Sequence, residues 1–310
     1  MKVSVVMATY NGEKYLSEQM NSIRLQTRKI DEVIFSDDNS SDGTKEIIGN
    51  YIKKYSLDGW KIVDGPQKGI TKNFYNGVTV ATGDIIFFSD QDDIWELEKI
   101  EEMMRPFECS NILTVTCRKK LIDASGNFTN EYPDFVVYPF IRKGLGKELK
   151  LLVELKYLTG SGLCLAFRKK IFGEVQKIVE KYDLQYDLPF AIISSIKNGN
   201  YSLNKKFVLH RIHTSNASSP INSIGGRRGK IQHQILSHSM KKRLLNAVLK
   251  EYEKDLSNRE TKIISRAIQL HQEYITALKN KNLLKLFYLI IVGNKIINRF
   301  LGISDIISAL

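Results

Sequence analysis

Three aspartates crowd into four positions of the chain, at Asp90, Asp92 and Asp93. Carboxylates this close repel one another unless a cation lies among them. Their hard oxygen atoms suit Mg²⁺ or Mn²⁺, ions that commonly keep waters and bind the phosphates of a substrate. A solvated acidic turn is the ordinary alternative for an isolated Asp-x-Asp. Because an apolar run over residues 85–89 leads directly into these aspartates, we instead predict a divalent-metal site with Asp90 and Asp92 as ligands.

A second polar cluster, Asp-Asp-Asn-Ser-Ser-Asp-Gly, occupies residues 37–43. Helix capping explains Ser41 and Asp42, but it does not need both Asp37 and Asp38. A carboxylate at a strand end can accept a hydrogen bond from a nucleotide base or from ribose hydroxyls. The choice between Asp37 and Asp38 stays open. No G-x-G-x-x-G follows the first strand, which disfavours a nicotinamide-dinucleotide domain.

The elements that position these clusters alternate between two patterns. Apolar, β-rich runs predict strands over residues 3–8, 32–36, 60–63 and 84–89, and helical spacing predicts helices over 13–26, 44–55 and 71–81. Such alternation indicates an α/β fold with a parallel sheet and helices on both faces. Ligands bind beyond the carboxyl ends of the strands in these sheets. The polar clusters at 9–12, 37–43 and 90–93 should therefore converge on one rim.

The remainder of the chain has a different pattern of apolar and polar residues. Residues 110–225 predict mixed strands (112–116, 160–167, 207–212) and a helix over 171–182. Beyond residue 225 we expect helices over 231–254 and 259–279 and an amphipathic helix over 281–300. We predict one globular unit over 1–226, with halves 1–100 and 101–226, and a basic helical region over 227–310.

Five motifs in the first hundred residues resemble those of family 2 glycosyltransferases, in the order and spacing of that family. They are Ala-Thr-Tyr-Asn-Gly (8–12), the 37–43 cluster, Gly-Ile-Thr-Lys-Asn (69–73), Ala-Thr-Gly-Asp (81–84) and Phe-Ser-Asp-Gln-Asp-Asp-Ile-Trp (88–95). The resemblance implies a Rossmann-like A-type glycosyltransferase fold, with a mixed, mainly parallel sheet and a C-terminal helical extension. It also implies a nucleotide-diphospho-sugar donor, a divalent metal and inversion at the anomeric carbon.

The roles of several residues follow from that resemblance. The residues expected to line the donor nucleotide are Thr9, Tyr10, Asn11, Asp37 or Asp38, Lys72, Asp90 and Arg211. For Lys72 the alternative is a surface lysine on a helix. Asp92, with Asp90, would hold a metal that neutralises charge on the leaving diphosphate.

An inverting transfer also needs a base that takes the proton of the acceptor hydroxyl. Residues 158–167 resemble the small-residue strand beside the acceptor, and Asp187 lies where related enzymes carry the base in a His-Asp-Trp-like segment. Here Tyr186 and Leu188 replace His and Trp. Asp183 is the nearby competitor, and either aspartate could simply cap a helix.

A last segment, His-Arg-Ile-His-Thr-Ser-Asn over 210–216, resembles the family's Tyr-Arg-x-His-x-x-Asn. An Arg-x-His on a strand places Arg211 and His213 on one face, where either could approach the diphosphate or the metal. We expect Trp95 to pack beneath its loop, and His238 and His271 to lie on helix surfaces.

The net charge of +12 is unevenly distributed, because 16 of the 46 basic but only 6 of the 34 acidic residues follow residue 226. A basic amphipathic helix suits an anionic membrane surface, with packing on the first unit or in a homodimer as the alternative. Binding of nucleic acid is disfavoured, since no recognised module accompanies the charge. Three scattered cysteines, no signal peptide and no apolar run long enough to span a bilayer predict a cytoplasmic protein, peripheral at the inner face of the membrane.

These observations lead to one main hypothesis: an inverting, metal-dependent glycosyltransferase of bacterial cell-surface polysaccharide synthesis. The motifs resemble rhamnosyltransferases, which favours dTDP-L-rhamnose as donor and a glycan or lipid-linked glycan as acceptor. A UDP-hexose or UDP-N-acetylhexosamine is the alternative donor. A nucleotidyltransferase is disfavoured because no Gly-rich phosphate loop is present near the N-terminus. A non-catalytic membrane- or RNA-binding module is the alternative from another class.

Overall fold

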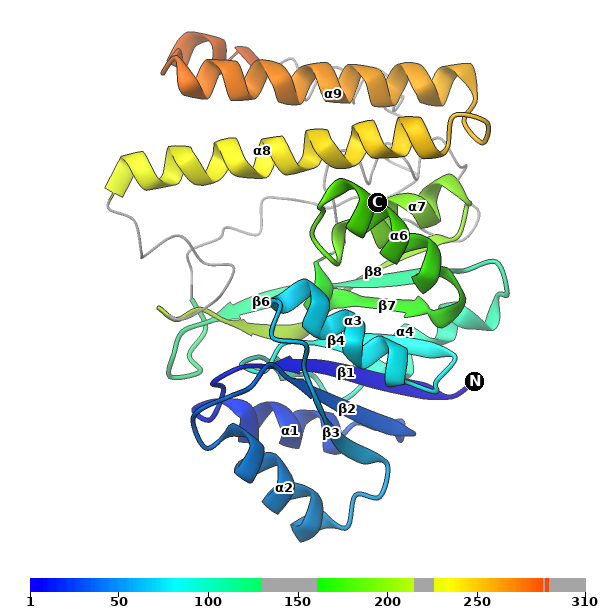
Figure 1. Cartoon of the computed structure of the whole chain (residues 1–310), viewed down its shortest axis with the longest axis vertical. Coiled ribbons are helices and arrows are strands. Elements are labelled where there is room, and N and C mark those ends of the chain that lie inside the picture. The colour runs from blue at the N-terminus through cyan, green and yellow to red at the C-terminus, as the bar shows by residue number, and fades with distance from the viewer. Residues whose placement is uncertain (130–160, 215–225, 287, 290–310) are drawn as a thin grey trace.

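A single sheet of eight strands forms the centre of the computed structural model, which describes residues 1–129, 161–214, 226–286 and 288–289 (Figure 1). The strand order is β3-β2-β1-β4-β7-β6-β8-β5. The strands are β1 (Val3–Thr9), β2 (Glu32–Asp37), β3 (Trp60–Asp64), β4 (Ile85–Ser89), β5 (Ile94–Trp95), β6 (Thr114–Ile122), β7 (Leu165–Arg168) and β8 (Asn200–Arg211). The α-helices are α1 (Leu16–Arg24), α2 (Thr44–Tyr55), α3 (Ile70–Val80), α4 (Lys99–Met104), α6 (Phe172–Tyr182), α7 (Leu188–Ile196), α8 (Gly226–Glu251) and α9 (Asn258–Lys279).

The first four strands pair in parallel, as their alternation with helices predicts. β1 lies between β2 and β4, with Val6 opposite Ile34 on one side and Phe88 on the other. Because β2 and β4 lie on opposite sides of β1, the strand order reverses at β1. This topology opens a crevice at the carboxyl ends of the strands. β7 is antiparallel to both β4 and β6, whereas β6 and β8 are parallel. The sheet is thus mixed and mainly parallel, as expected.

Both faces of the sheet are covered by helices, so each strand presents apolar side chains on both sides. Val5 and Met7 of β1 pack with α1, α2 and α4 in one core cluster. Val6 packs on the other face, in a cluster that includes apolar residues of α3, α6 and α7. The continuous apolar run of β1 follows from this burial on both faces.

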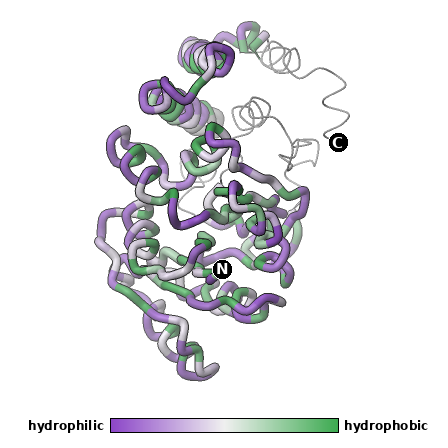
Figure 2. The backbone as a smooth tube through the Cα atoms, turned by 90° about the vertical axis from the view of Figure 1, so that its right-hand side faces the viewer, coloured by the Kyte–Doolittle hydropathy of each residue, from purple (hydrophilic) through white to green (hydrophobic). Residues whose placement is uncertain are grey.

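Helices α8 and α9 lie side by side along one side of the molecule (Figure 1). Hydrophilic and hydrophobic residues alternate along them (Figure 2), and Leu244 and Val248 of α8 join the core cluster beside α6 and α7. A capping box at Ser257 begins α9. Both helices match the predicted ranges, whereas most of the expected helix over 281–300 lies outside the described residues. The boundary at residue 226 stays a prediction. Within the described part of the chain, every helix is too short or too polar to cross a bilayer.

The expectation that His238 and His271 lie on helix surfaces was wrong. Their Nδ1 atoms are 2.9 Å apart and join α8 to α9, and the ring of Tyr274 stacks on His238. Burial lowers the pKa of His238 to about 4 and that of His271 to about 3. Both imidazoles are therefore neutral at pH 7, which allows one to donate and the other to accept.

Candidate active site

The loops that follow β1 and β2 are joined by direct hydrogen bonds. The backbone N–H of Asp38 donates to the Thr9 carbonyl over 2.9 Å. The Asn11 side-chain oxygen accepts from the backbone N–H of Ser41 over 2.9 Å. Asn11 has a φ of 47°, in the left-handed region that Asn tolerates better than most residues. Two polar clusters thirty residues apart in sequence thus form one surface.

Gln91 brings the third loop into the same surface. Its side-chain oxygen accepts from the Tyr10 N–H, and its amide nitrogen donates to the Tyr10 carbonyl, each over 3.0 Å. The Gln91 side chain lies directly over Gly12, where a Cβ would come within 2.3 Å of Oε1. Only glycine leaves room for this bridge. The predicted convergence of the three clusters on one rim is confirmed.

The two adjacent aspartates of the second loop have different environments. Asp37 is buried, and its Oδ2 accepts from the hydroxyls of Thr9 (2.8 Å) and Ser40 (2.6 Å). Asp38 is partly exposed and accepts backbone N–H groups of Gln67 and Gly69. Asp37 therefore organises the loop, whereas Asp38 lies where a bound molecule can reach it.

Two histidines of the β8 segment support the acidic loop. His213 Nε2 lies 2.8 Å from Asp92 Oδ2, and His210 Nδ1 lies 2.9 Å from Asp93 Oδ1. The other oxygen of Asp93 is buried and has no hydrogen-bond partner among the described residues. Sequence reasoning identified His213 but missed His210. The first histidine of the His-Arg-Ile-His run was the available signal.

The carboxyl groups of this loop are electrostatically crowded. Burial raises the pKa of Asp90 well above its usual value, and the charges of Asp93, Asp92 and Asp187 add to that effect. Burial and Asp93 also raise the pKa of Asp92, against the opposing effect of His213. This arrangement fits a site that a cation completes. In the described ranges, however, no three His, Cys, Asp or Glu side chains form a preassembled metal site. A cation would therefore need further ligands, as Mg²⁺ finds on substrate phosphates.

Arg211 has a supporting position beneath the loop. Its guanidinium is buried, donates to the Asp92 carbonyl (3.0 Å) and to Glu18 (2.5 Å), and lies 4.6 Å from the Tyr15 ring centroid. The His213 ring lies 4.8 Å from the same ring. Sequence reasoning identified neither Tyr15 nor Glu18, because their partners are almost two hundred residues away.

Asp187 lies at the start of α7 and belongs to the same charged region, since its charge raises the pKa of Asp90. Its Oδ2 accepts the Gly162 N–H over 2.7 Å. Burial raises the pKa of Asp187 to about 6, although the bond from Gly162 opposes the rise. The competing Asp183 is 98% exposed and pairs with Arg243 of α8, so it is a surface residue.

Other predicted residues fall away from the acidic loop or outside the described residues. Lys72 Nζ lies 2.6 Å from Glu180 of α6, which is the surface pairing that we weighed as its alternative. Trp95 is buried and packs against Phe87, so the expected packing role is confirmed. Residues 158–160 and 215–216 lie outside the described residues.

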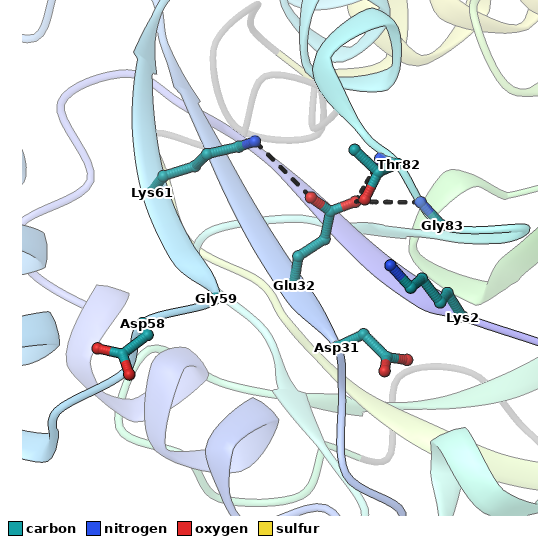
Figure 3. Close-up of a pocket in the computed structure, with 8 residues that line it drawn as sticks. All are labelled: Lys2, Asp31, Glu32, Asp58, Gly59, Lys61, Thr82 and Gly83. Atoms are coloured by element: carbon teal, nitrogen blue, oxygen red, sulfur yellow. Dashed lines mark hydrogen bonds and ion pairs between the residues drawn. The ribbon is translucent and has the colours of Figure 1, made fainter.

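A pocket of about 310 Å³ opens at the opposite edge of the sheet, where the strands begin (Figure 3). It is lined by Lys2, Asp31, Glu32, Asp58, Gly59, Lys61, Thr82 and Gly83. The Glu32 carboxylate accepts from Ser4 Oγ and from the Gly83 N–H, so it anchors the turn before β4. Glu32 also pairs with Lys61, and the polar clusters identified from the sequence lie at the other end of the strands, so the rim carries the candidate site.

Comparison with known proteins gives a consistent result. The family model described as "Glycosyl transferase family 2" matches residues 4–176. The dTDP-rhamnosyl transferase RfbG of Shigella flexneri is 30% identical over 226 residues, which cover 68% of this chain and 72% of that protein. A β-1,3-glucosyltransferase of Campylobacter jejuni that acts on GalNAc(5)-diNAcBac-PP-undecaprenol is 26% identical, with 68% and 65% covered. An uncharacterised glycosyltransferase of Nostoc is 30% identical, and the match spans 38% of its length.

Solved structures share the fold at low sequence identity. Residues 1–349 of Staphylococcus aureus TarS, in complex with UDP-GlcNAc, superpose with a TM-score of 0.53 and 17% identity, covering 89% of this chain and 82% of that one. The mannosyltransferase PcManGT of Pyrobaculum calidifontis, in complex with GDP-Man and Mn²⁺, gives a TM-score of 0.53 and 15% identity, with 99% and 85% covered. The fold is therefore the A-type glycosyltransferase fold. The family match, together with the three joined loops, leads to one conclusion: the chain belongs to glycosyl transferase family 2 and is a glycosyltransferase.

Proposed function

We propose that this glycosyltransferase moves L-rhamnose from dTDP-L-rhamnose to a glycan acceptor, with inversion, during bacterial cell-surface polysaccharide synthesis. The observation that carries the catalytic part is that Asp187, whose Oδ2 accepts the Gly162 N–H, is close enough to Asp90 for its charge to raise the pKa of that carboxyl. The similarity to a dTDP-rhamnosyl transferase over two thirds of the chain supports the donor.

The donor nucleotide binds to the surface formed by the first two loops. Asp38 accepts the base N–H or the ribose hydroxyls, because it is partly exposed whereas Asp37 is buried. Tyr10, with 59% of its surface exposed, is free to lie against the base. Asn11 and Thr9 hold this surface in shape.

Asp92 and Asp90 would hold Mg²⁺ or Mn²⁺, which would take further ligands from the donor diphosphate. When bound, the ion neutralises the charge that develops on the leaving diphosphate. The crowding of the Asp90, Asp92 and Asp93 carboxyl groups supports this assignment, as does the Mn²⁺ in PcManGT. His213 orients the Asp92 carboxylate through its 2.8 Å contact, and Arg211 fixes the backbone of the same residue.

Asp187 takes the proton of the acceptor hydroxyl. The hydroxyl oxygen then attacks the anomeric carbon from the face opposite the diphosphate, and the bond from that carbon to the diphosphate oxygen breaks. A base works best when its pKa is close to the working pH, and burial brings Asp187 to about 6.

A UDP-hexose or UDP-N-acetylhexosamine is the second candidate donor. The UDP-GlcNAc bound to TarS and the glucosyltransferase activity named for the Campylobacter relative favour it. The contacts above recognise the nucleotide and the diphosphate, which the two classes of donor share.

A lipid-linked acceptor would bring the protein to the membrane. Leu283, Leu284 and Tyr288 are more than half exposed beside Lys281 and Lys285, near the end of α9. We infer that this surface, defined by residues 281–286 and 288, contacts the inner face of the cell membrane as a peripheral site.

The test is transfer from dTDP-L-rhamnose, UDP-glucose and UDP-GlcNAc to lipid-linked acceptors, with and without EDTA. We expect transfer from dTDP-L-rhamnose that EDTA abolishes and Mn²⁺ or Mg²⁺ restores. Asp92→Asn should lose metal-dependent dTDP binding, whereas the exposed Asp183→Asn should transfer normally. Transfer from a UDP-sugar alone would replace the donor, and unchanged transfer in EDTA would remove the metal.

A further inference from the structure

Lys99, the first residue of α4, carries a charge that the proposed reaction does not use. Its side chain is completely buried. Its Nζ donates to the Leu163 carbonyl over 2.8 Å and lies 3.5 Å from the centroid of the Trp95 ring. Across the described residues no carboxylate lies within ion-pair distance of it.

Burying an ammonium without a carboxylate partner is unfavourable, by several kcal/mol per ion even after relaxation. Burial indeed lowers the pKa of Lys99, while the nearby thiols of Cys117 and Cys164 and the charge of Asp93 oppose that change. A methionine of similar length would fill the same space without this cost. The contacts of the ammonium therefore explain why a lysine occupies this position.

Its two contacts belong to opposite sides of the candidate site. Trp95 ends β5, directly after the acidic loop. Leu163 lies in the short turn η2 (Gly162–Cys164), whose first residue donates its N–H to Asp187. A short path of contacts thus leads from the acidic loop through Trp95, Lys99 and Leu163 to Gly162 and Asp187.

We propose that Lys99 is a positioning residue, which holds the η2 turn through the Leu163 carbonyl and thereby fixes Asp187 relative to the acidic loop. This inference rests on the proposed role of Asp187 as base. The ammonium provides a charge-assisted hydrogen bond to a carbonyl that no aliphatic side chain could hold. Its cation–π contact with Trp95 connects the η2 turn to β5, the strand that follows the aspartates.

The test is Lys99→Met, which keeps the length of the side chain and removes its donor. We expect kcat for transfer to fall at least tenfold, while the Kd of dTDP and of UDP, each measured with Mn²⁺, stays within threefold. Amide hydrogen exchange should become faster in residues 161–164 and stay unchanged in β4. Lys99→Gln, which retains an N–H donor on a shorter side chain, should have an intermediate kcat.

The matched control is Lys205→Met. Lys205 of β8 is exposed and pairs with Glu102 of α4, the helix that also carries Lys99. It should keep wild-type kcat. The inference is overturned if Lys99→Met transfers at the wild-type rate, if it loses kcat and nucleotide affinity equally, or if neither Lys99 variant folds. A wild-type rate in Asp187→Asn would refute the base itself, whereas the exchange of residues 161–164 reports on the Lys99 contact independently.

Discussion

Much of this site consists of side chains that hold other residues of the site in place. Asp37 holds Ser40 and Thr9, and Arg211 holds the backbone of Asp92. These residues are buried, whereas Asp38 and Asp92 remain partly exposed. A supporting carboxylate or guanidinium in this position fixes a loop before the substrate arrives, which lowers the entropic cost of organising it later.

The pH dependence of transfer should report on Asp187. Because burial raises its pKa to about 6, the carboxylate is mostly ionised at pH 7 and mostly protonated at pH 5. We expect kcat to fall about tenfold per pH unit below 6, as a protonated base cannot accept the acceptor proton. Steady-state kinetics between pH 5 and 8 measure this fall in kcat on the acidic side. Asp187→Asn should reduce kcat at least a hundredfold and leave dTDP affinity unchanged, and a rate that is constant down to pH 5 would contradict the assignment.

Gly12→Ala tests the bridge between the first and third loops. The new Cβ would lie 2.3 Å from Gln91 Oε1, so the flexible Gln91 side chain must move and lose both bonds to Tyr10. Each bond is worth about 1 kcal/mol, which predicts a roughly tenfold or greater loss of donor affinity in calorimetric titration. Gln91→Ala should match this loss, and the double variant should be no worse than either.

Gly49→Ala is the control for that experiment. Gly49 lies within α2 and nothing would touch its Cβ within 4 Å, so alanine should stabilise the helix by up to about 1 kcal/mol and leave donor affinity unchanged. If Gly12→Ala binds donor normally, the Gln91 bridge does not shape the site.

Single residues also show where prediction from sequence ends. The aspartates at 37–38 and 90–93 could be predicted, because each cluster follows an apolar strand within a few positions. The partners of His210 and Lys99 could not, since Asp93 and Leu163 are 117 and 64 residues away. No local pattern records such a contact, and only the pairing of β5 with β8 and the turn before β7 bring these residues together.

At the scale of elements, the predicted helices and strands were mostly found because their periodicity is strong. The alternation of strand and helix patterns over residues 3–89 predicted the parallel half of the sheet. The order of the other strands was not predictable, because β7, β6, β8 and β5 pair with mixed directions and β6 contains register shifts near Arg118. Antiparallel β7 is the element that places Gly162 and Asp187 beside the carboxyl end of β4.

The α8–α9 hairpin should become less stable in acid because of its histidine pair. The folded-state pKa values of about 4 and 3 lie below the ordinary value of 6.5, so the unfolded chain binds more protons at pH 5. Stability is therefore present above pH 6.5 and falls as pH decreases toward 4. Circular dichroism melts at pH 7.5 and 5 should show a larger drop in Tm for the wild type than for the His238→Leu/His271→Leu double variant.

Ser257→Ala provides the comparison within the same hairpin. It removes the capping box of α9 at a cost of about 1 kcal/mol, but it leaves the histidine pair intact. Its Tm should be lower at both pH values by a similar amount. Equal pH dependence in the wild type and the double leucine variant would show that the histidine pair does not limit stability in acid.

At the scale of the whole molecule, charge and apolar exposure are separated along the chain. Residues 1–226 are nearly balanced and hold an acidic rim, whereas the excess of basic residues follows residue 226. Apolar residues of α8 and α9 pack in the core, and the two most exposed leucines of the described residues, Leu283 and Leu284, lie just beyond α9. Under the proposed membrane contact, this division would let the basic end of the chain attract an anionic surface while the site keeps its carboxylates apart from it.

Binding to lipid vesicles tests that division on the full chain. We expect cosedimentation with vesicles that contain phosphatidylglycerol, and weak binding to pure phosphatidylcholine, since each basic residue near an anionic surface contributes about 1 kcal/mol. Binding should weaken as salt rises from 50 to about 300 mM, because the Debye length shortens to below 8 Å. Leu283→Ser/Leu284→Ser should reduce binding at least tenfold without changing transfer to a soluble acceptor analogue. Leu97→Ser is the matched control, since Leu97 is 50% exposed and lies on the catalytic part of the chain. If all three proteins bind both vesicle types equally, the surface of residues 281–286 and 288 does not contact the membrane, and the basic helices serve packing alone.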